Sequence, residues 1–488
     1  MCEMKKISTF SGGNMKEKKL AYIKTYDKRG LTEFCRYLVE YGYELIAEED
    51  TLSYLQKAEI PVRPVCGKNV FDLNIQLAIV NLYPFKKDME SGSAFRETAA
   101  LIDTQGVAAL SAAAKNFGET VAVCDPDDYE KLLCGLAVGE ISEEDRMYFM
   151  YKAFSYTAAY HALVSQYLAR ELNILFPQTL TVTYEKAQDM RYGENPHQRA
   201  AVYREPLLKE GSLARAKQLS GPVISYNNVN DANTAIGLVK EFEGPTVAVC
   251  KHCTPCSVGT GESVYEAFEA AYLADPLKMY GGILAVNGVL DARTAEALKN
   301  LSAEVVVAVG FTPEAMNVLQ FERSLILLEM PDIRSKVQFT FHLQKIYGGL
   351  LMQTYDTFTY ENARCVTERA PTANERKALD FNYKVAKHAR SSAVVIGKDG
   401  VTAGIGTGQT NRTLALKAAL SIAGKGAAGC VAVSDFRFPT LECVELCHAA
   451  GITAIMQTGE SPLDAKMIEL CNKYRIAMLF TGARHFKN

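Results

Sequence analysis

Apolar and polar residues follow two spacings that alternate along the first part of the chain. Short apolar runs typical of strands occupy residues 20–26, 43–50, 76–85 and 120–126. Apolar residues at helical spacing lie between them, over residues 31–42 and 104–118. Strands that alternate with helices predict a parallel sheet covered on both faces, so we expect an α/β domain at residues 20–125.

The next stretch, from Asp127 to Leu175, has helical spacing almost throughout. We interpret residues 126–180 as a helical connector, with a separate small bundle as the alternative. The α/β pattern returns at about Thr181 and continues to the end of the chain.

Two stretches of this second half resemble each other. Residues 281–310 and 429–459 both show a strand, a short loop, a helix and a strand at nearly equal spacing. Such a repeat predicts two related α/β subdomains, which we place at residues 181–365 and 366–488.

Composition narrows the possible partners. The net charge of −3 over 488 residues gives no general attraction for nucleic acid or membranes, so local cations must hold any anionic ligand. Residues 1–19 are polar and predict a disordered tail rather than a secretory signal. No apolar run is long enough to span a membrane. The 13 cysteines are scattered, which favours reduced thiols in a cytoplasmic protein.

Three of these cysteines, Cys250, Cys253 and Cys256, have the spacing of thiolate ligands for zinc or an iron–sulfur cluster. Three thiolates need a fourth ligand, and the next cysteine is Cys365. Cys250 ends an apolar run typical of a buried strand, so we favour buried apolar side chains and predict no metal site. A cluster-bearing protein remains the alternative.

Lys251 and His252 lie within the same run. We expect them at the carboxyl end of a parallel strand, where open α/β sheets bind ligands. The sequence SVGTG, residues 257–261, predicts a loop of small residues that lets the backbone approach a bound molecule. A surface pair without a function is the alternative.

Two more polar runs are candidate ligand sites. RYGENPHQ, residues 191–198, contains an arginine, a side chain that can bind a phosphate through two hydrogen bonds. GIGTGQTNR, residues 404–412, precedes a stretch with helical spacing but lacks the dinucleotide fingerprint G-x-G-x-x-G. Ordinary turns are the alternatives for both.

The motifs RYGENPHQ, SYNN, KHCTPC, YGGI, GIGTGQTNR, SDFRFP and MLFTGARHF follow one another in this order. Together they resemble the bifunctional purine-biosynthesis family, AICAR transformylase/IMP cyclohydrolase. The resemblance implies a methylglyoxal-synthase-like parallel-sheet domain, followed by two subdomains similar to the cytidine deaminase fold but without zinc. It also implies a homodimer with the active site at the interface, and transfer of a formyl group from 10-formyltetrahydrofolate to the amine of AICAR.

The family motifs imply roles for residues of this chain. His252 would take a proton from the weakly nucleophilic amine, because imidazole titrates near neutral pH. Lys251 would stabilise the negative charge that develops as the amine attacks. The substrate-binding residues so implied are Arg191, Tyr192, Tyr280, Ser392 and Arg484. Those implied for the folate are Gln409, Arg412, Arg437 and Glu442.

The amino half departs from this family. The family's S-V-S-D-K-T-G is KTYDKRG here, and its phosphate loop S-T-G-G-T is AEEDT, residues 47–51, whose three carboxylates would repel a phosphate. A block containing G-R-V-K-T-L-H-P and H-G-G-I-L is absent, and with it the arginine and lysine that contact the nucleotide. We therefore expect this half to have lost cyclohydrolase activity and to serve as a scaffold.

Three departures fall in the second half, where Ser392 replaces an asparagine, Arg437 an aromatic residue and Glu442 an aspartate. Serine reaches less far than asparagine, and glutamate is one methylene longer than aspartate, so folate recognition is affected more than proton transfer. The leading hypothesis is a monofunctional AICAR transformylase. The alternative is an impaired paralogue that binds a purine nucleotide in a sensory or scaffold role.

Overall fold

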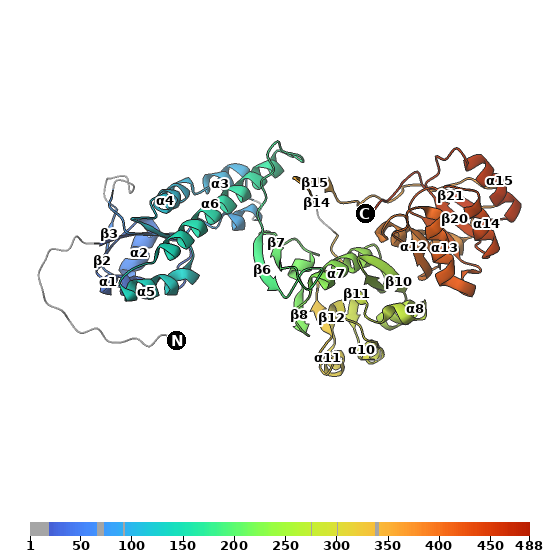
Figure 1. Cartoon of the computed structure of the whole chain (residues 1–488), viewed down its shortest axis with the longest axis horizontal. Helices are drawn as coiled ribbons and strands as arrows, with labels where there is room; N and C mark the ends of the chain where they lie inside the picture. The colour runs from blue at the N-terminus through green and yellow to red at the C-terminus, as the bar shows by residue number, and fades with distance from the viewer. Residues whose placement is uncertain (1–18, 66–72, 91–92, 275, 300, 337–340) are drawn as a thin grey trace, which may run out of the picture. The chain divides into compact units, whose positions relative to one another are not determined.

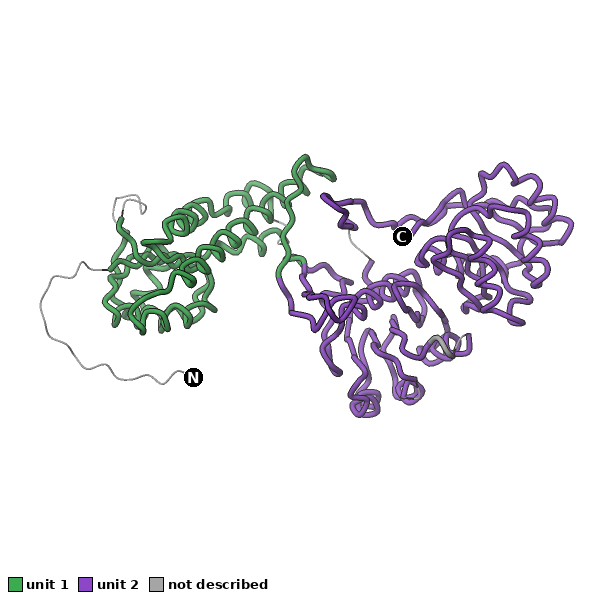
Figure 2. The backbone as a smooth tube through the Cα atoms, viewed as in Figure 1, with its two compact units in different colours: residues 1–185, 205–207 green, residues 186–204, 208–488 purple. Residues whose placement is uncertain are grey.

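The computed structural model describes residues 19–65, 73–90, 93–274, 276–299, 301–336 and 341–488. The chain divides into two compact units, Met1–Glu185 with Glu205–Leu207 and Lys186–Arg204 with Leu208–Asn488 (Figure 2). The predicted tail, residues 1–19, lies outside the described residues except for Lys19, which begins the first strand.

The first unit, blue to teal in Figure 1, contains a five-stranded sheet. Its strand order is β3-β2-β1-β4-β5, and every neighbouring pair is parallel. Its strands are β1 (Lys19–Lys24), β2 (Tyr43–Ala47), β3 (Val62–Pro64), β4 (Leu77–Val80) and β5 (Val121–Val123). The predicted parallel sheet is therefore confirmed. The strand order reverses between β1 and β4, the position at which such sheets bind ligands beyond the carboxyl ends of the strands.

The helices of this unit cover the sheet. They are α1 (Leu31–Glu40), α2 (Glu49–Lys57), α3 (Phe95–Ala100), α4 (Thr104–Lys115), α5 (Tyr129–Val138) and α6 (Glu143–Glu171). The end of the predicted strand over residues 43–50 instead opens α2, because Glu48 is the N-cap residue of that helix.

The helices predicted as a connector, over residues 126–180, pack on the first sheet. Leu132 of α5 and Phe149 of α6 are buried in the same apolar cluster as β1, β2 and β4. Ala153 is buried in a second cluster that also contains residues of β4 and α4. Neither a free connector nor a separate bundle describes these helices, because each buries an apolar face against the sheet or its covering helix.

The second unit contains a twelve-stranded mixed sheet in the order β16-β21-β20-β19-β17-β18-β10-β9-β11-β12-β13-β8. Its first strands are β8 (Lys217–Ser220), β9 (Thr246–Lys251), β10 (Thr254–Thr260), β11 (Ile283–Leu290), β12 (Val305–Phe311) and β13 (Ile326–Glu329). The others are β16 (Arg364–Cys365), β17 (Val394–Lys398), β18 (Val401–Gly406), β19 (Val431–Ser434), β20 (Ala454–Gln457) and β21 (Ala477–Phe480). Two short hairpins add β6 (Glu185–Met190) with β7 (Ala200–Arg204), and β14 (Phe341–Ile346) with β15 (Gly349–Thr354).

The two halves of this sheet repeat one pattern of pairing. Moving outward from the centre, β10-β9-β11-β12-β13-β8 and β18-β17-β19-β20-β21-β16 show the same sequence of antiparallel and parallel neighbours. The halves meet where β10 and β18 pair antiparallel at Gly259 and Val401. Residues predicted as two subdomains thus share one sheet in one compact unit, and the boundary at residue 365 falls in the edge strand β16.

Helices cover each half in the same order. The first half carries α7 (Tyr226–Val239), α8 (Val264–Ala274), α9 (Pro276–Met279), α10 (Ala292–Lys299) and α11 (Pro313–Leu319). The second carries α12 (Ala373–His388), α13 (Arg412–Ala423), α14 (Glu442–Ala449) and α15 (Asp464–Tyr474).

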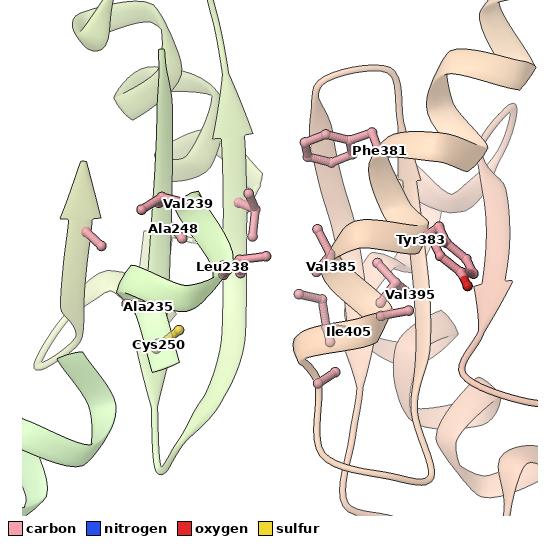
Figure 3. Packing of buried hydrophobic residues seen from close by; sticks show 14 of the residues in the cluster. Ala235, Leu238, Val239, Ala248, Cys250, Phe381, Tyr383, Val385, Val395 and Ile405 are labelled. Carbon is pink, nitrogen blue, oxygen red and sulfur yellow. The ribbon is translucent and has the colours of Figure 1, made fainter. Parts of the chain in front are cut away.

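Helices α7 and α12 carry residues of one apolar cluster that includes strands of both halves (Figure 3). Leu238 lies with Ala248 and Cys250 on one side, and Val385 lies with Val395 and Ile405 on the other (Figure 3). The ring of Phe242, shortly after α7, packs against that of Phe381 in the middle of α12, with centroids 5.3 Å apart. This shared core fixes the two halves of the sheet relative to each other.

Four residues of the predicted loop SVGTG, Ser257 to Thr260, belong to strand β10, and Gly261 follows it. A side chain on Gly259 would overlap the backbone of Ala267 and Ala271 in α8, and one on Gly406 would overlap Ala415 in α13. These glycines therefore permit close contact of a helix with a strand, and the prediction that SVGTG is a ligand loop is wrong.

Candidate active site

Lys251 and His252 lie at a β-hairpin turn. Strand β9 is antiparallel to both β10 and β11, so the expected position at the end of a parallel strand is wrong. Lys251 pairs with Thr254, which leaves His252 and Cys253 as the two turn residues. Both are left-handed, with φ of 52° and 58°, the conformation that a two-residue turn of this kind requires.

The turn is held from α7. The Asp231 carboxylate accepts hydrogen bonds from the backbone N–H of His252 at 3.0 Å and of Cys253 at 2.5 Å. The His252 side chain remains exposed. The imidazole is thus carried on a backbone whose two turn amides share one carboxylate.

Lys251 is half-buried, and its Nζ donates to the backbone carbonyl of Tyr280. The Tyr280 side chain is 66% exposed. The ammonium therefore lies close to the turn that carries His252, and the Tyr280 ring is free to meet a ligand.

Arg191 and Tyr192 line a cavity of about 210 Å³ at the start of α7. Its wall includes the N-cap Ser225 and Asn228, which together form a capping box. Arg191 donates to the carbonyl of Val223 at 3.4 Å and is otherwise exposed. A guanidinium beside a helix N-terminus is an arrangement suited to an anion such as a phosphate.

Helix α7 connects this cavity with the hairpin turn. Asn227 donates to the carbonyl of Glu194 in the RYGENPHQ loop, and Asp231 lies four residues further along α7. Residues four apart lie on the same face of a helix, about 6 Å from each other. The loop of Arg191 and the turn of His252 are therefore adjacent.

The second half of the sheet adjoins the same turn. Thr254 Oγ1 lies 2.9 Å from Thr407 Oγ1, just after β18. The Ser392 N–H donates to the Gln409 carbonyl at 3.0 Å, and the Gln409 N–H donates to the Ser392 carbonyl at 3.4 Å. Ser392 is 8% exposed, and its neighbour Ser391 donates its N–H to the Lys487 carbonyl. Two of the predicted site residues, Ser392 and Gln409, are thus direct neighbours.

Arg412, Phe436, Arg437, Arg484 and Phe486 form what we call the arginine–phenylalanine cluster. Arg412 begins α13 and is joined to the buried Asp435 carboxylate, with Nε 2.9 Å from Oδ1. Its guanidinium lies 5.0 Å from the centre of the Phe436 ring and 5.2 Å from that of Phe486.

The two other arginines complete the cluster. Arg484 lies 4.5 Å from the Phe486 ring, and Arg437 lies 5.0 Å from the Phe436 ring. Among the described residues, Arg412 forms a salt bridge with a carboxylate, whereas Arg437 and Arg484 form none. Arg437 donates instead to the backbone carbonyl of Glu460. The cluster therefore presents aromatic faces together with positive charge.

Glu442 is placed apart from this cluster. It begins α14 and forms an ion pair of 2.6 Å with Lys417 of α13, in which both side chains are about half exposed. Its carboxylate is thus engaged by Lys417, whereas Arg412, Arg437 and Arg484 share the rings of the cluster.

Sequence reasoning missed three residues that support the site. Asp231 and Asp435 are the carboxylates that hold the turn and Arg412. His485 is 3% exposed and lies between the Tyr383 hydroxyl, at 2.5 Å from Nε2, and the Asp356 carboxylate. Asp435 is the second residue of the SDFRFP motif, so a sequence signal for it existed. Nothing in the local sequence pairs Asp231 with turn residues 21 and 22 positions away.

Cys250 and Cys253 of the predicted thiolate run lie in different surroundings. Cys250 is fully buried in the shared core, and burial raises the pKa of its thiol far above the usual value. Cys253 is half-buried, and burial together with the Asp231 carboxylate raises its pKa. Among the residues that the structure describes, no group of three histidine, cysteine, aspartate or glutamate side chains is arranged to hold a metal ion.

In the first unit, carboxylates occupy the ligand edge of the parallel sheet. Glu48 caps α2, and Glu49 and Asp50 form its first turn. Burial and the adjacent Glu48 carboxylate raise the pKa of Tyr22. Lys24 at the end of β1 is engaged by Asp103, 3.4 Å away. The positive end of the helix dipole is therefore already compensated by acidic side chains.

No helix within the described ranges of the chain is long and apolar enough to cross a bilayer.

Comparison with known proteins covers both units. A family model described as AICARFT/IMPCHase bienzyme matches residues 113–422, and one of the MGS-like domain matches residues 30–108. The bifunctional purine biosynthesis protein PurH of Ruminiclostridium cellulolyticum is 40% identical over 512 residues, covering 96% of this chain and 100% of the relative. PurH of Halalkalibacterium halodurans is 40% identical over 511 residues, with the same coverage.

A solved structure described as "Crystal structure of ForH" covers 31% of this chain and 98% of its own, at 26% identity and a TM-score of 0.27. The MGS-like match lies within the first unit. It confirms the methylglyoxal-synthase-like parallel-sheet domain expected there.

Proposed function

Because this chain belongs to the AICARFT/IMPCHase bienzyme family and is an AICAR formyltransferase of purine biosynthesis, we propose that it makes formyl-AICAR but does not close the purine ring. The formyl donor proposed is 10-formyltetrahydrofolate, and the acceptor is the 5-amino group of AICAR. The observation that carries the proposal is the His252 turn, which lies beside the Arg191 cavity and carries Lys251 at its base.

The chemistry assigned to the turn is general base catalysis. The amine of AICAR is conjugated with its ring and carboxamide, so it attacks the formyl carbon only as its proton is removed. The exposed imidazole of His252 is suited to accept this proton near neutral pH. The Lys251 ammonium stabilises the oxyanion that forms on the formyl group, and its proton is available to the departing folate nitrogen.

The substrate is assigned to the Arg191 cavity. Arg191 and the first N–H groups of α7 suit the phosphate of AICAR, with Tyr192 in the same wall. Ser392 and the exposed Tyr280 ring are assigned to the base, and Arg484 to the nucleotide.

The folate is assigned to the arginine–phenylalanine cluster. Flat aromatic faces suit the pterin ring. The guanidinium groups of Arg437 and Arg484, which pair with no carboxylate among the described residues, suit the carboxylates of the glutamate tail. Gln409 follows the glycine turn beside Ser392 and is assigned to the same pocket. Glu442 is the weakest member of this set, because Lys417 already engages its carboxylate.

The interface with a second copy of the chain is assigned to the β14–β15 hairpin. Tyr347 at its tip is fully exposed, and Leu351 is 54% exposed. Apolar side chains in such number on an isolated hairpin favour burial in an interface. We propose a cytoplasmic homodimer whose active site is completed across this interface.

Loss of ring closure is supported by the acidic start of α2. A phosphate at this edge would meet Glu48, Glu49 and Asp50 in place of free backbone N–H groups. Lys24, at the end of β1, already pairs with Asp103. The described residues at this edge therefore disfavour a nucleotide phosphate.

Purified protein incubated with AICAR and 10-formyltetrahydrofolate is expected to accumulate formyl-AICAR without IMP, because only the second unit retains a competent site. Mass spectrometry of the products checks this result. A PurH relative treated in the same way provides the positive control for ring closure. Formation of IMP by the purified chain, from either AICAR or added formyl-AICAR, would contradict the proposed loss.

A nucleotide-binding paralogue without transferase activity is the second candidate, favoured by Ser392, Arg437 and Glu442 at altered positions. In thermal-shift titrations, a transformylase is expected to be stabilised by both AICAR and the folate, by about 2.7 kcal/mol at a hundredfold excess over Kd. The paralogue would respond to AICAR alone. If so, Arg437→Phe and Ser392→Asn together should restore the response to folate.

A further inference from the structure

We propose that Asp231 is the positioning residue of His252: its carboxylate holds the hairpin turn in the left-handed conformation from which the imidazole reaches the substrate. The inference rests on the proposed role of His252 as the base. Both oxygens of the Asp231 carboxylate are engaged by backbone N–H groups of the turn, so the role assigned to Asp231 is exerted through the turn.

The turn needs such support because of its sequence. Two-residue hairpin turns with left-handed backbone at both positions favour asparagine, aspartate and glycine. Here they hold His252 and Cys253, with φ of 52° and 58°. Side chains disfavour this conformation, so the surrounding structure must impose it.

The Asp231 carboxylate supplies this constraint. Its two oxygens accept the N–H groups of the two left-handed residues separately, Oδ2 from His252 and Oδ1 from Cys253. Hydrogen bonds to an ionised acceptor are the stronger kind, and two of them fix orientation as well as distance. In the extended conformation the same amides would point elsewhere, so the carboxylate selects the left-handed form.

The position of Asp231 also links the base to the substrate cavity. Asp231 is one helical turn after Asn227, whose side chain holds the RYGENPHQ loop at the Glu194 carbonyl. One rigid helix thus sets the distance between the residues that bind the phosphate and the residue that takes the proton. A displacement of about 1 Å in such an arrangement costs about 10²-fold in rate.

The test compares Asp231→Asn with the unmodified full-length enzyme. An asparagine amide offers one acceptor and places donors against the second N–H, so the turn loses half of its support. We expect kcat to fall about 10- to 100-fold while KM for AICAR stays within about threefold, because the Arg191 cavity is unchanged. Asp291→Asn, which removes a carboxylate that accepts the N–H of Thr294, is the matched control and should keep full kcat.

Rescue separates positioning from a general loss of structure. Cys253→Gly in the Asp231→Asn background places a residue that adopts positive φ freely, so the turn forms without the carboxylate. We expect kcat to recover at least about fivefold in the double variant, relative to Asp231→Asn. A loss of structure elsewhere would leave the double variant as slow as the single one, which would overturn the proposal.

Different variants test the role of His252 as the base and the role of Asp231 in positioning it. If His252→Ala keeps the unmodified rate, His252 is not the base and the proposed function of the turn fails. If His252→Ala is inactive but Asp231→Asn keeps kcat within about threefold, the base is correct and the positioning role of Asp231 is refuted.

Discussion

Replacing His252 by alanine is expected to lower kcat for formyl transfer by about 10²- to 10⁴-fold, the range typical for loss of a general base. The amine of AICAR must lose a proton as it attacks, and alanine offers no acceptor. Because His252 is an exposed turn residue, the substitution removes no buried contact. Steady-state kinetics with AICAR and 10-formyltetrahydrofolate measure the effect.

The control for this variant is His448→Ala. His448 lies on α14 and stacks on Tyr474, away from the hairpin turn, so its loss should change kcat less than threefold. Unchanged binding of AICAR by the His252 variant, seen by thermal shift, shows that the cavity is intact. A His252→Ala enzyme with a rate close to that of the unmodified protein would remove the imidazole from the mechanism.

The second large effect is expected in stability, at Glu241. This carboxylate lies between helices α7 and α12 and receives Lys387 Nζ and His388 Nε2, both at 2.9 Å. The three side chains are at most 19% exposed. Glu241→Gln leaves the Lys387 ammonium buried without its counter-charge, so we expect a loss of about 3–5 kcal/mol.

The same group makes stability depend on pH. Burial alone would raise the pKa of Glu241, but hydrogen bonds and charge from His388 and Lys387 outweigh it and lower the pKa to about 2. A lowered carboxylate pKa gives stability that is complete above the unfolded value of about 4.3 and is lost as pH falls toward 2. Burial also lowers the pKa of His388, which adds to the loss of stability below pH about 6.5.

Urea unfolding followed by circular dichroism, at pH 7 and at pH 3, measures both effects. Glu241→Gln should lower the midpoint at pH 7 and flatten its fall toward acid. Glu296→Gln is the matched control, since Glu296 forms an exposed pair with Lys299 that is worth less than about 1 kcal/mol. Equal midpoints for the two variants would show that the buried triad does not hold the halves together.

Local signals in the sequence predicted where helices form better than they predicted which surfaces those helices pack against. The helix α6 follows from its spacing and from Ser142 with three acidic residues after it, and it forms as predicted. Its docking on the first sheet was not predicted, because an apolar face does not say which surface it covers. The capping box of Thr372 and Glu375, where α12 begins, lies just after the predicted subdomain boundary at residue 365.

For the candidate site, too, the sequence indicated residue types but not their structural setting. The motifs made Lys251, His252, Arg191 and Arg412 candidates, because the family resemblance implies roles for these residue types. They did not reveal that His252 lies at a hairpin turn, because neither turn residue is a glycine or asparagine.

By itself, the sequence determined the family, the parallel sheet of the first unit and the repeat in the second, because these depend on residue types and spacing along the chain. Only the tertiary structure decided that Asp231 meets the His252 turn, that Asp435 neutralises Arg412 and that Lys417 engages Glu442. Each of these contacts joins residues from different elements. Whether such groups meet depends on how helices and strands pack, and the spacing of residues along the chain does not give the distance between them in space.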